Sequence, residues 1–265
     1  MDLISLRPLD LGIAAGLVLL LAALSWRLHL GVERRILIAA TRSTVQLILL
    51  GFVLKLLFET TQPLLIGLLA LFMLSVAGWE VMARQGRRFR GAWGYGIGAL
   101  SMFLSSFSIT MLALAVIIRV DPWYQPQYLI PLLGMLLGNT MSGIAIALDN
   151  LTRQAAEQRQ RIEARLMLGA TWNEAIVDLR RDALRSGLIP IVNAMASAGV
   201  VSLPGMMTGQ ILAGADPVQA VEYQIVVMFM IAAAVALGCI LIALLVYRRF
   251  FNARHQVRPE GIEER

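Results

Sequence analysis

Residues 225–246 read IVVMFMIAAAVALGCILIALLV, a run of 22 residues without a charged side chain. A helix of about 20 apolar residues can cross the hydrocarbon core of a bilayer, because its backbone polar groups are all satisfied within the helix. The chain as a whole agrees with this segment, since 58% of its residues are hydrophobic, 15% are charged and its mean hydropathy is +0.72. Soluble domains carry about a quarter charged residues. The sequence therefore predicts an all-α, polytopic membrane protein.

Working outward from this segment, we expect seven membrane-spanning helices within a single transmembrane domain that occupies residues 1–265. The first apolar run is too long for the core of a signal peptide and no basic segment precedes it, so we expect it to be a helix of the mature protein. The seven predicted spans cover residues 9–28, 36–57, 64–82, 94–118, 128–148, 187–203 and 221–247.

The arginines predict how the spans are oriented. Of the 23 lysine and arginine residues, 20 lie after the first, third and fifth runs and in the C-terminal tail, whereas the alternate loops carry almost none. Short loops rich in positive charge stay on the cytoplasmic side of a membrane. We therefore expect the N-terminus outside and the C-terminus inside, and we interpret the net charge of +6 as a topology signal, not as a nucleic-acid surface.

Several functions are excluded because the residues that they require are missing or lie in the wrong place. Cys239 is the single cysteine, so one chain can form neither a disulfide nor a cysteine-based zinc site. Lys55 is the single lysine and lies in Val-Leu-Lys-Leu-Leu, which is not the Gly-Lys-Ser/Thr of a P-loop, so the chain alone is not an ATPase of that type. His29 and His255 are both predicted to be cytoplasmic, and no carboxylate lies in the middle of a span. The sequence therefore predicts no enzyme and leaves any metal ligands unknown.

The long polar stretch 150–186 is predicted to form a cytoplasmic helix–turn–helix. Gly169 suits the left-handed conformation that ends a helix. Thr171 and Glu174 then form a capping box, which predicts a second helix from Trp172. Two interpretations remain open, an exposed docking element or a connecting loop that happens to be helical.

This segment resembles a known element. Glu163-Ala164-Arg165-Leu-Met-Leu-Gly169-Ala170-Thr171 is similar to the Glu-Ala-Ala-x-x-x-Gly loop of ABC-transporter permeases, which docks into the ATPase subunit, although Arg165 replaces the second alanine. The wider sequence resembles FetB-type iron-export ABC permeases, which are related to plant aluminium-tolerance membrane subunits. The resemblance is carried by residues 42–51, 130–141, 201–209, 216–217 and 223–225.

The resemblance implies a bacterial inner-membrane permease subunit that exports a metal ion such as iron, or another small solute. It also implies a homodimer in membrane lipid, with ATP bound by a separate ATPase subunit and no cofactor on this chain. Alternatives are a non-transporting relay coupled to an ATPase and a secondary carrier. The residues expected to couple to the ATPase are Glu163, Ala164, Leu168, Gly169, Ala170, Thr171, Trp172 and Glu174.

Two apolar segments share the pattern G-M-x-x-G-[N/Q]-x-x-x-G and each follows a proline. Such interrupted helices point to substrate sites in transporters, but Gly-x-x-x-Gly is also a close-packing device, and both interpretations remain open. We expect Pro204 to Met207 and Gly134–Met135 to form an outer constriction. Polar side chains within membrane spans cost free energy and often have a function, so we add those in these spans as candidates. The predicted pathway residues are Arg42, Gln46, Pro131, Gly134, Met135, Gly138, Asn139, Met141, Pro204, Gly205, Met206, Met207, Gly209, Tyr223 and Gln224.

Overall fold

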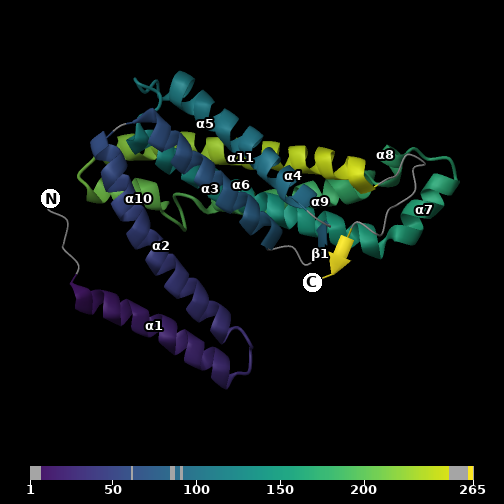
Figure 1. Ribbon diagram of the computed structural model, residues 1–265, viewed down its shortest axis with the longest axis horizontal. Coiled ribbons are helices and arrows are strands. Elements are labelled where there is room, and N and C mark those ends of the chain that lie inside the picture. Colours follow the sequence, from purple (N-terminus) through teal and green to yellow (C-terminus); the bar gives the residue numbers. More distant parts are fainter. Residues whose placement is uncertain (1–6, 61, 84–86, 90–91, 251–261, 265) are drawn as a thin grey trace.

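A computed structural model describes residues 7–60, 62–83, 87–89, 92–250 and 262–264 and shows an elongated helical bundle (Figure 1). Six helices of the described residues are long and apolar enough to cross a membrane, which confirms the helical membrane architecture. In chain order they are α1 (Pro8–Arg27), α2 (Glu33–Thr60), α3 (Pro63–Ala83), the composite helix that begins with α4 (Ala92–Met102), α6 (Pro126–Glu157) and α11 (Pro217–Phe250).

The fourth of these helices changes its winding twice. After α4 it continues through η1 (Phe103–Phe107), α5 (Ser108–Leu112) and η2 (Ala113–Ile117), where η1 and η2 are π-helical turns. A π-helical turn holds an additional residue and therefore changes which side chains share a face. In η1 the buried side chains are Ser105 and Ser106, whereas Phe103 and Phe107 stack on each other with ring centroids 5.1 Å apart.

The predicted span 187–203 is not one of the six, which corrects the sequence prediction of seven continuous spans. Its apolar residues form only the second half of α9 (Val177–Ser197), and the first half of that helix is strongly charged. The chain then leaves the helix at Ala198 and begins a new one at Gly205, α10 (Gly205–Leu212). Figure 1 shows α8 and α10 at opposite ends of the long helices α6 and α11, so this broken segment still runs along the bundle.

The predicted helix–turn–helix is present with its predicted break. It consists of α7 (Arg159–Met167) and a single helical turn, α8 (Trp172–Ala175), after which α9 begins at Val177. The interruption at Ile176 was not predicted. The first G-M-x-x-G stretch also differs from expectation, because α6 runs without a break through Pro131 and all of its glycines. Pro131 lies inside the helix and has no N–H to donate, so one helical hydrogen bond is missing there although the helix continues.

A short pair of strands departs from the all-α prediction. Strand β1 (Arg87–Phe89) pairs antiparallel with β2 (Ile262–Glu264), so the loop after α3 meets the end of the chain. The arginines at positions 84, 90, 254, 258 and 265, which contributed to the predicted orientation, lie outside the described residues.

The core lies where α6, α9 and α11 cross, and these helices pack closely because small residues meet there. A Cβ added to Gly187 would lie 2.8 Å from the carbonyl oxygen of Gly143 and 2.9 Å from the Sγ of Cys239. A Cβ on Gly238 would lie 2.7 Å from Thr140. These contacts leave no room for a side chain at either glycine.

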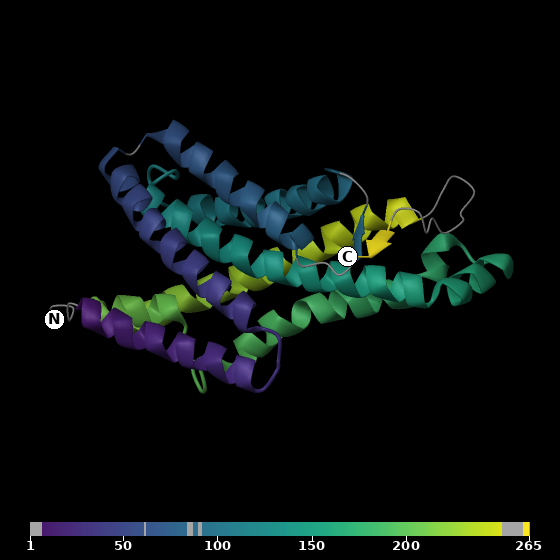
Figure 2. The same ribbon diagram turned by 60° about the horizontal axis from the view of Figure 1, so that its bottom comes forward.

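Helices α1 and α2 form a hairpin that stands apart from this core (Figures 1 and 2). Helix α2 makes its close backbone contacts mainly with α1, whereas α3 packs on α4 and α6. Most side chains of the hairpin are therefore exposed within one chain, and they are predominantly apolar, as expected for helices surrounded by lipid.

Candidate functional site

The turn between α7 and α8 is a rigid tip at one end of the bundle. Gly169 adopts φ = +89°, a left-handed conformation that suits glycine. The N–H of Gly169 donates to the carbonyl of Leu166 at 3.0 Å, and the N–H of Ala170 donates to the carbonyl of Arg165 at 3.1 Å. The next helix starts with the predicted capping box, because the N–H of Thr171 donates to Glu174 Oε2 at 2.7 Å and the hydroxyl of Thr171 accepts from the N–H of Glu174.

Arg165 braces the two arms of the tip. Its guanidinium donates to Oδ2 of Asp178 at 2.8 Å and to the carbonyl of Ala175 at 3.3 Å. This hydrogen bond from Arg165 lowers the pKa of the Asp178 carboxyl, and hydrogen bonds from Thr171 lower the pKa of Glu174. The residue that departs from the ABC-permease pattern thus fixes the angle between α7 and α9.

The apex of the tip is apolar and open to solvent. Met167 is 82% exposed and Leu168 is 88% exposed. In contrast, Trp172 packs against the core and the Glu163 carboxylate is bound by Arg159 at 2.7 Å on the same helix. Leu168 was predicted as a coupling residue, whereas Met167 was not, because a single exposed methionine leaves no signature in a sequence rich in methionine.

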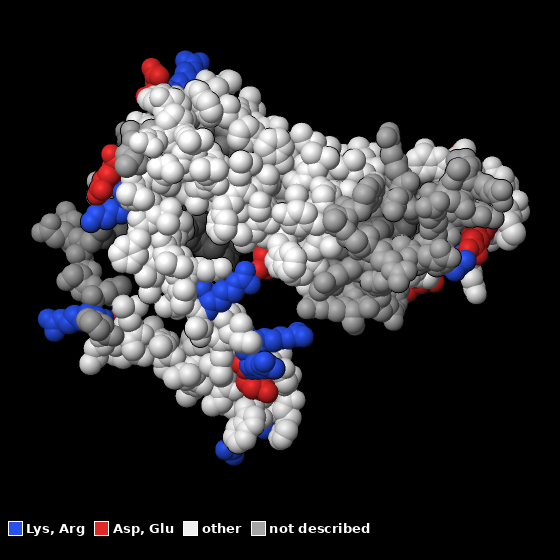
Figure 3. All heavy atoms as spheres, viewed as in Figure 1, with Lys and Arg blue, Asp and Glu red and all other residues white. Residues whose placement is uncertain are grey.

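A second feature is a cavity of about 840 Å³ between α2, α3 and α6. It contains four predicted pathway residues, Arg42 and Gln46 from α2 and Gly134 and Met141 from α6. Arg42 forms an ion pair with Glu80 of α3 across the cavity. Figure 3 shows the hollow in this face of the molecule with acidic and basic side chains at its edge.

The face of α6 that turns away from the core is open and partly polar. Asn139 is exposed and its Nδ2 donates to the carbonyl of Met135 at 2.8 Å within α6. One turn on, the hydroxyl of Ser142 donates to the carbonyl of Gly138 at 3.1 Å. Further along the same face, a smaller cavity of about 270 Å³ is lined by Ser142, Ala145, Ile146, Asp149, Asn150 and Arg153.

The remaining predicted pathway residues gather at α10 and the start of α11, which pack on each other. Met207 is buried, and Gln224 is also buried with no hydrogen bond to its Oε1 among the described residues. Pro204 precedes the first residue of α10 and its carbonyl accepts from the hydroxyl of Thr208 at 3.1 Å. Met206 is half-buried, and Gly205, Gly209 and Tyr223 are exposed.

The expected outer constriction is not formed within the described part of one chain. The nearest atom to a Cβ built on Gly134 is the Cε of Met73 on α3, at 3.2 Å, and a Cβ on Gly138, Gly205 or Gly209 meets no atom within 4 Å. Pro131 is exposed and Met135 is half-buried. The predicted residues thus form three separate groups, in the α2–α3–α6 cavity, on the open face of α6 and at α10–α11.

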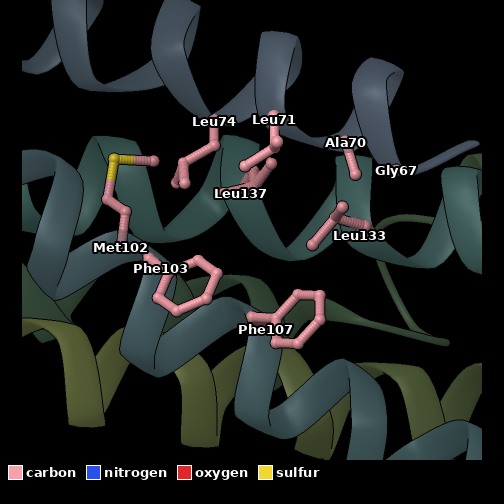
Figure 4. Close-up of a pocket in the computed structure, with 9 residues that line it drawn as sticks. All are labelled: Gly67, Ala70, Leu71, Leu74, Met102, Phe103, Phe107, Leu133 and Leu137. Carbon is pink, nitrogen blue, oxygen red and sulfur yellow. The ribbon is translucent and has the colours of Figure 1, made fainter. Parts of the chain in front are cut away.

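A third cavity was not indicated by the sequence. It has a volume of about 210 Å³ and lies between α3, η1 and α6. Figure 4 shows the rings of Phe103 and Phe107 on one side and Leu71, Leu74, Leu133 and Leu137 across from them. Its lining is almost wholly apolar, with Gly67, Ala70 and Met102 as the other members. The π-helical turn that creates this arrangement follows no pattern in the residues.

Among the described residues, no three histidine, cysteine, aspartate or glutamate side chains lie together as a metal-binding group.

Comparisons with known proteins assign the chain to a group. Residues 8–251 match the model of the family described as "Uncharacterised protein family (UPF0014)". A UPF0014 membrane protein of Synechocystis is 41% identical over 256 residues, which cover 96% of this chain and 98% of the relative. The probable iron export permease protein FetB of Escherichia coli is 37% identical over 253 residues, with 94% and 93% covered.

A plant relative extends the comparison. The protein ALUMINUM SENSITIVE 3 of Arabidopsis thaliana is 36% identical over 247 residues, which cover 92% of this chain and 88% of the relative. No solved structure matched the chain.

Proposed function

This chain belongs to the UPF0014 family of multi-pass membrane proteins, and from that premise we propose that it is the permease subunit of an ABC exporter, driven by a separate ATPase subunit that binds the ATP. The proposed cargo is a metal ion such as iron or another small solute. The name of the Escherichia coli relative supports iron, and the chain's own residues do not select among these cargoes.

The observation that carries the proposal is the exposed apolar apex of the α7–α8 tip. Met167 and Leu168 lie at the end of a short, doubly braced hairpin, where burial of their side chains against a partner would be favourable. A rigid hairpin loses little conformational entropy on binding, so it suits docking into a preformed groove. The partner surface that we propose is a groove on a separate ATPase subunit.

The structure suggests how a push on this tip would reach the membrane. Helix α9 starts at the tip and continues into the core, where Gly187 contacts α6 and α11. Asn150 of α6 also donates to the hydroxyl of Ser186 at 3.0 Å. Closure of an ATPase dimer against the tip would therefore shift α9 relative to α6 and α11, and packed helices respond to such a shift as rigid bodies.

We propose seven crossings with the N-terminus outside and the C-terminus in the cytoplasm. The seventh crossing is the broken segment of α9 and α10, and its support is that α8 and α10 lie at opposite ends of the bundle (Figure 1). We also propose a homodimer in the bacterial inner membrane. A second copy facing α6 would enclose Asn139 and Ser142, and a path between two such faces would spare these polar groups from lipid.

Copurification tests the docking step. Leu168→Glu and Met167→Glu should abolish capture of a co-encoded ATPase by the tagged permease while its level in the membrane stays normal, because the new charge would be buried in the interface. Gln160→Glu is the matched control, since Gln160 is exposed on α7 and receives the same charge away from the apex. Undiminished ATPase capture by both apex variants would contradict the proposal. Capture without any transport in liposomes would favour the relay function instead.

A further inference from the structure

We propose that the α2–α3–α6 cavity binds an anionic phospholipid of the cytoplasmic leaflet, with its phosphate beside Arg35 and Arg42 and an acyl chain along the apolar part of the cavity. The first observation is that polar and apolar lining residues lie at opposite ends of the cavity. The polar members Arg35, Arg42, Ser43 and Gln46 come from the first half of α2, and Glu80 comes from the end of α3.

The apolar members lie at the other end of the same cavity. Leu49, Leu50 and Val53 follow along α2, and Leu69, Phe72 and Met73 precede along α3. Helix α3 follows α2 after a short connection and runs back alongside it, and the Arg42–Glu80 ion pair places the start of α2 level with the end of α3. The polar ends of the two helices therefore coincide, and so do the apolar ends. The cavity therefore changes from charged to apolar along the membrane normal, as a phospholipid does.

The direction of this change fits one leaflet. The polar end lies where α3 ends, on the side of the bundle where α6 contacts β1 and continues toward α7, and this is the cytoplasmic side in the proposed topology. A lipid of the cytoplasmic leaflet has its headgroup on that side and its chains toward the bilayer centre. Basic pockets between spans on this side are suited to anionic headgroups.

The charge of the polar end favours a phosphate. Among the described lining residues, two guanidinium groups and one carboxylate face it, and their charges sum to +1. Arg42 is paired with Glu80, whereas the guanidinium of Arg35 has no ion-pair partner within the part of the chain that the structure describes. Arginine binds phosphate oxygens with charge-assisted hydrogen bonds. Arg35 is thus the group most available to the headgroup.

The packing of α2 supplies a reason for a lipid here. Helix α2 makes few close backbone contacts with the bundle, and a cavity of about 840 Å³ separates it from α3 and α6. An acyl chain in this space would replace contacts that the protein lacks and would hold the α1–α2 hairpin in place.

The experiment compares phosphatidylglycerol with phosphatidylcholine of the same acyl chains, added to the purified chain in neutral detergent and followed by native mass spectrometry and thermal melting. Phosphatidylglycerol should bind at least several-fold more tightly and raise the melting temperature. Arg35→Gln should remove most of this preference, whereas Arg34→Gln, an exposed neighbour that does not line the cavity, should keep it. Arg35 is the informative position because Arg42→Gln would also remove the cation beside Glu80.

A second pair of variants tests the acyl chain. Val76→Trp would fill the cavity and should weaken phosphatidylglycerol binding, whereas Leu68→Trp, on an exposed part of α3 outside the cavity, should not. Equal binding of both lipids, equal effects of Arg34→Gln and Arg35→Gln, or full stabilisation by glycerol phosphate without an acyl chain would overturn the proposal. The assay contains neither ATPase nor ATP, so its outcome is independent of the proposed transport function.

Discussion

At the scale of single residues, two helical glycines have opposite surroundings in the structure. Gly187 lies in the crossing of α6, α9 and α11, where an added methyl group would lie 2.8 Å from a backbone oxygen. We expect Gly187→Ala to destabilise the purified protein by about 1–3 kcal/mol, because the added methyl group would force the closely packed helices apart. Thermal melting in mild detergent checks this, and an unchanged midpoint would contradict the close packing of the core.

Gly67 is the counterpart. It lines the apolar cavity of Figure 4, and a Cβ at this position meets no atom within 4 Å. We expect Gly67→Ala to stabilise by about 1 kcal/mol, because alanine favours the helix and its methyl group enters empty apolar space. Gly16→Ala in α1 is the control. A Cβ at Gly16 also meets no atom within 4 Å, so this variant measures the effect of helix propensity alone. A lower melting temperature for Gly67→Ala would show that the cavity is already filled by a neighbouring side chain.

At the scale of elements, the hairpin of α7 and α8 is stabilised by ionised carboxylates. The pKa values of Glu174 and Asp178 are both lowered from their ordinary values of 4.5 and 3.8. A lowered pKa in the folded state means that the stabilisation is present above the ordinary pKa and is lost as the pH falls below it. We expect the amides of residues 171–178 to lose protection from hydrogen exchange as the pH falls below these ordinary pKa values, before those of α6 and α11.

The matched variant is Asp178→Asn, which removes the titrating group that Arg165 holds. Protection in this variant should already be reduced at neutral pH and should depend less on pH. The same acid-induced loss in both proteins would assign it to another group. Both groups are open to solvent, so the effect is expected to weaken in high salt.

A comparison of the predicted and observed elements shows which features of the fold can be predicted from the sequence. Hydropathy predicted six spans closely, and Gly169, Thr171 and Glu174 predicted the turn, because caps and apolar runs are local signals. The broken segment was mistaken for a continuous span, since hydropathy does not distinguish an apolar loop such as residues 198–204 from a helix. The pairing of Arg42 with Glu80 and the cavity at η1 depend on contacts between distant segments, and no local pattern encodes them.

At the scale of the whole molecule, the proposed orientation predicts which loops face outward. Single cysteines at Gln62, between α2 and α3, and at Gln125, before α6, should react with an impermeant thiol reagent on intact cells. A cysteine at Gln158, directly before α7, should react only after the cells are opened. The native Cys239 is buried and should give little background. The reverse labelling pattern would place the hairpin outside and remove its role in coupling.

The most direct measurement of the central proposal is ATP hydrolysis by the co-encoded ATPase reconstituted with this chain in liposomes. We expect the wild-type permease to raise the rate above that of the ATPase alone and to transport its cargo. Leu168→Glu should return the rate to that of the ATPase alone at an unchanged melting temperature, and Gln160→Glu should behave as the wild type. Full stimulation by Leu168→Glu, or cargo movement that needs no ATPase, would contradict a permease driven through the α7–α8 tip.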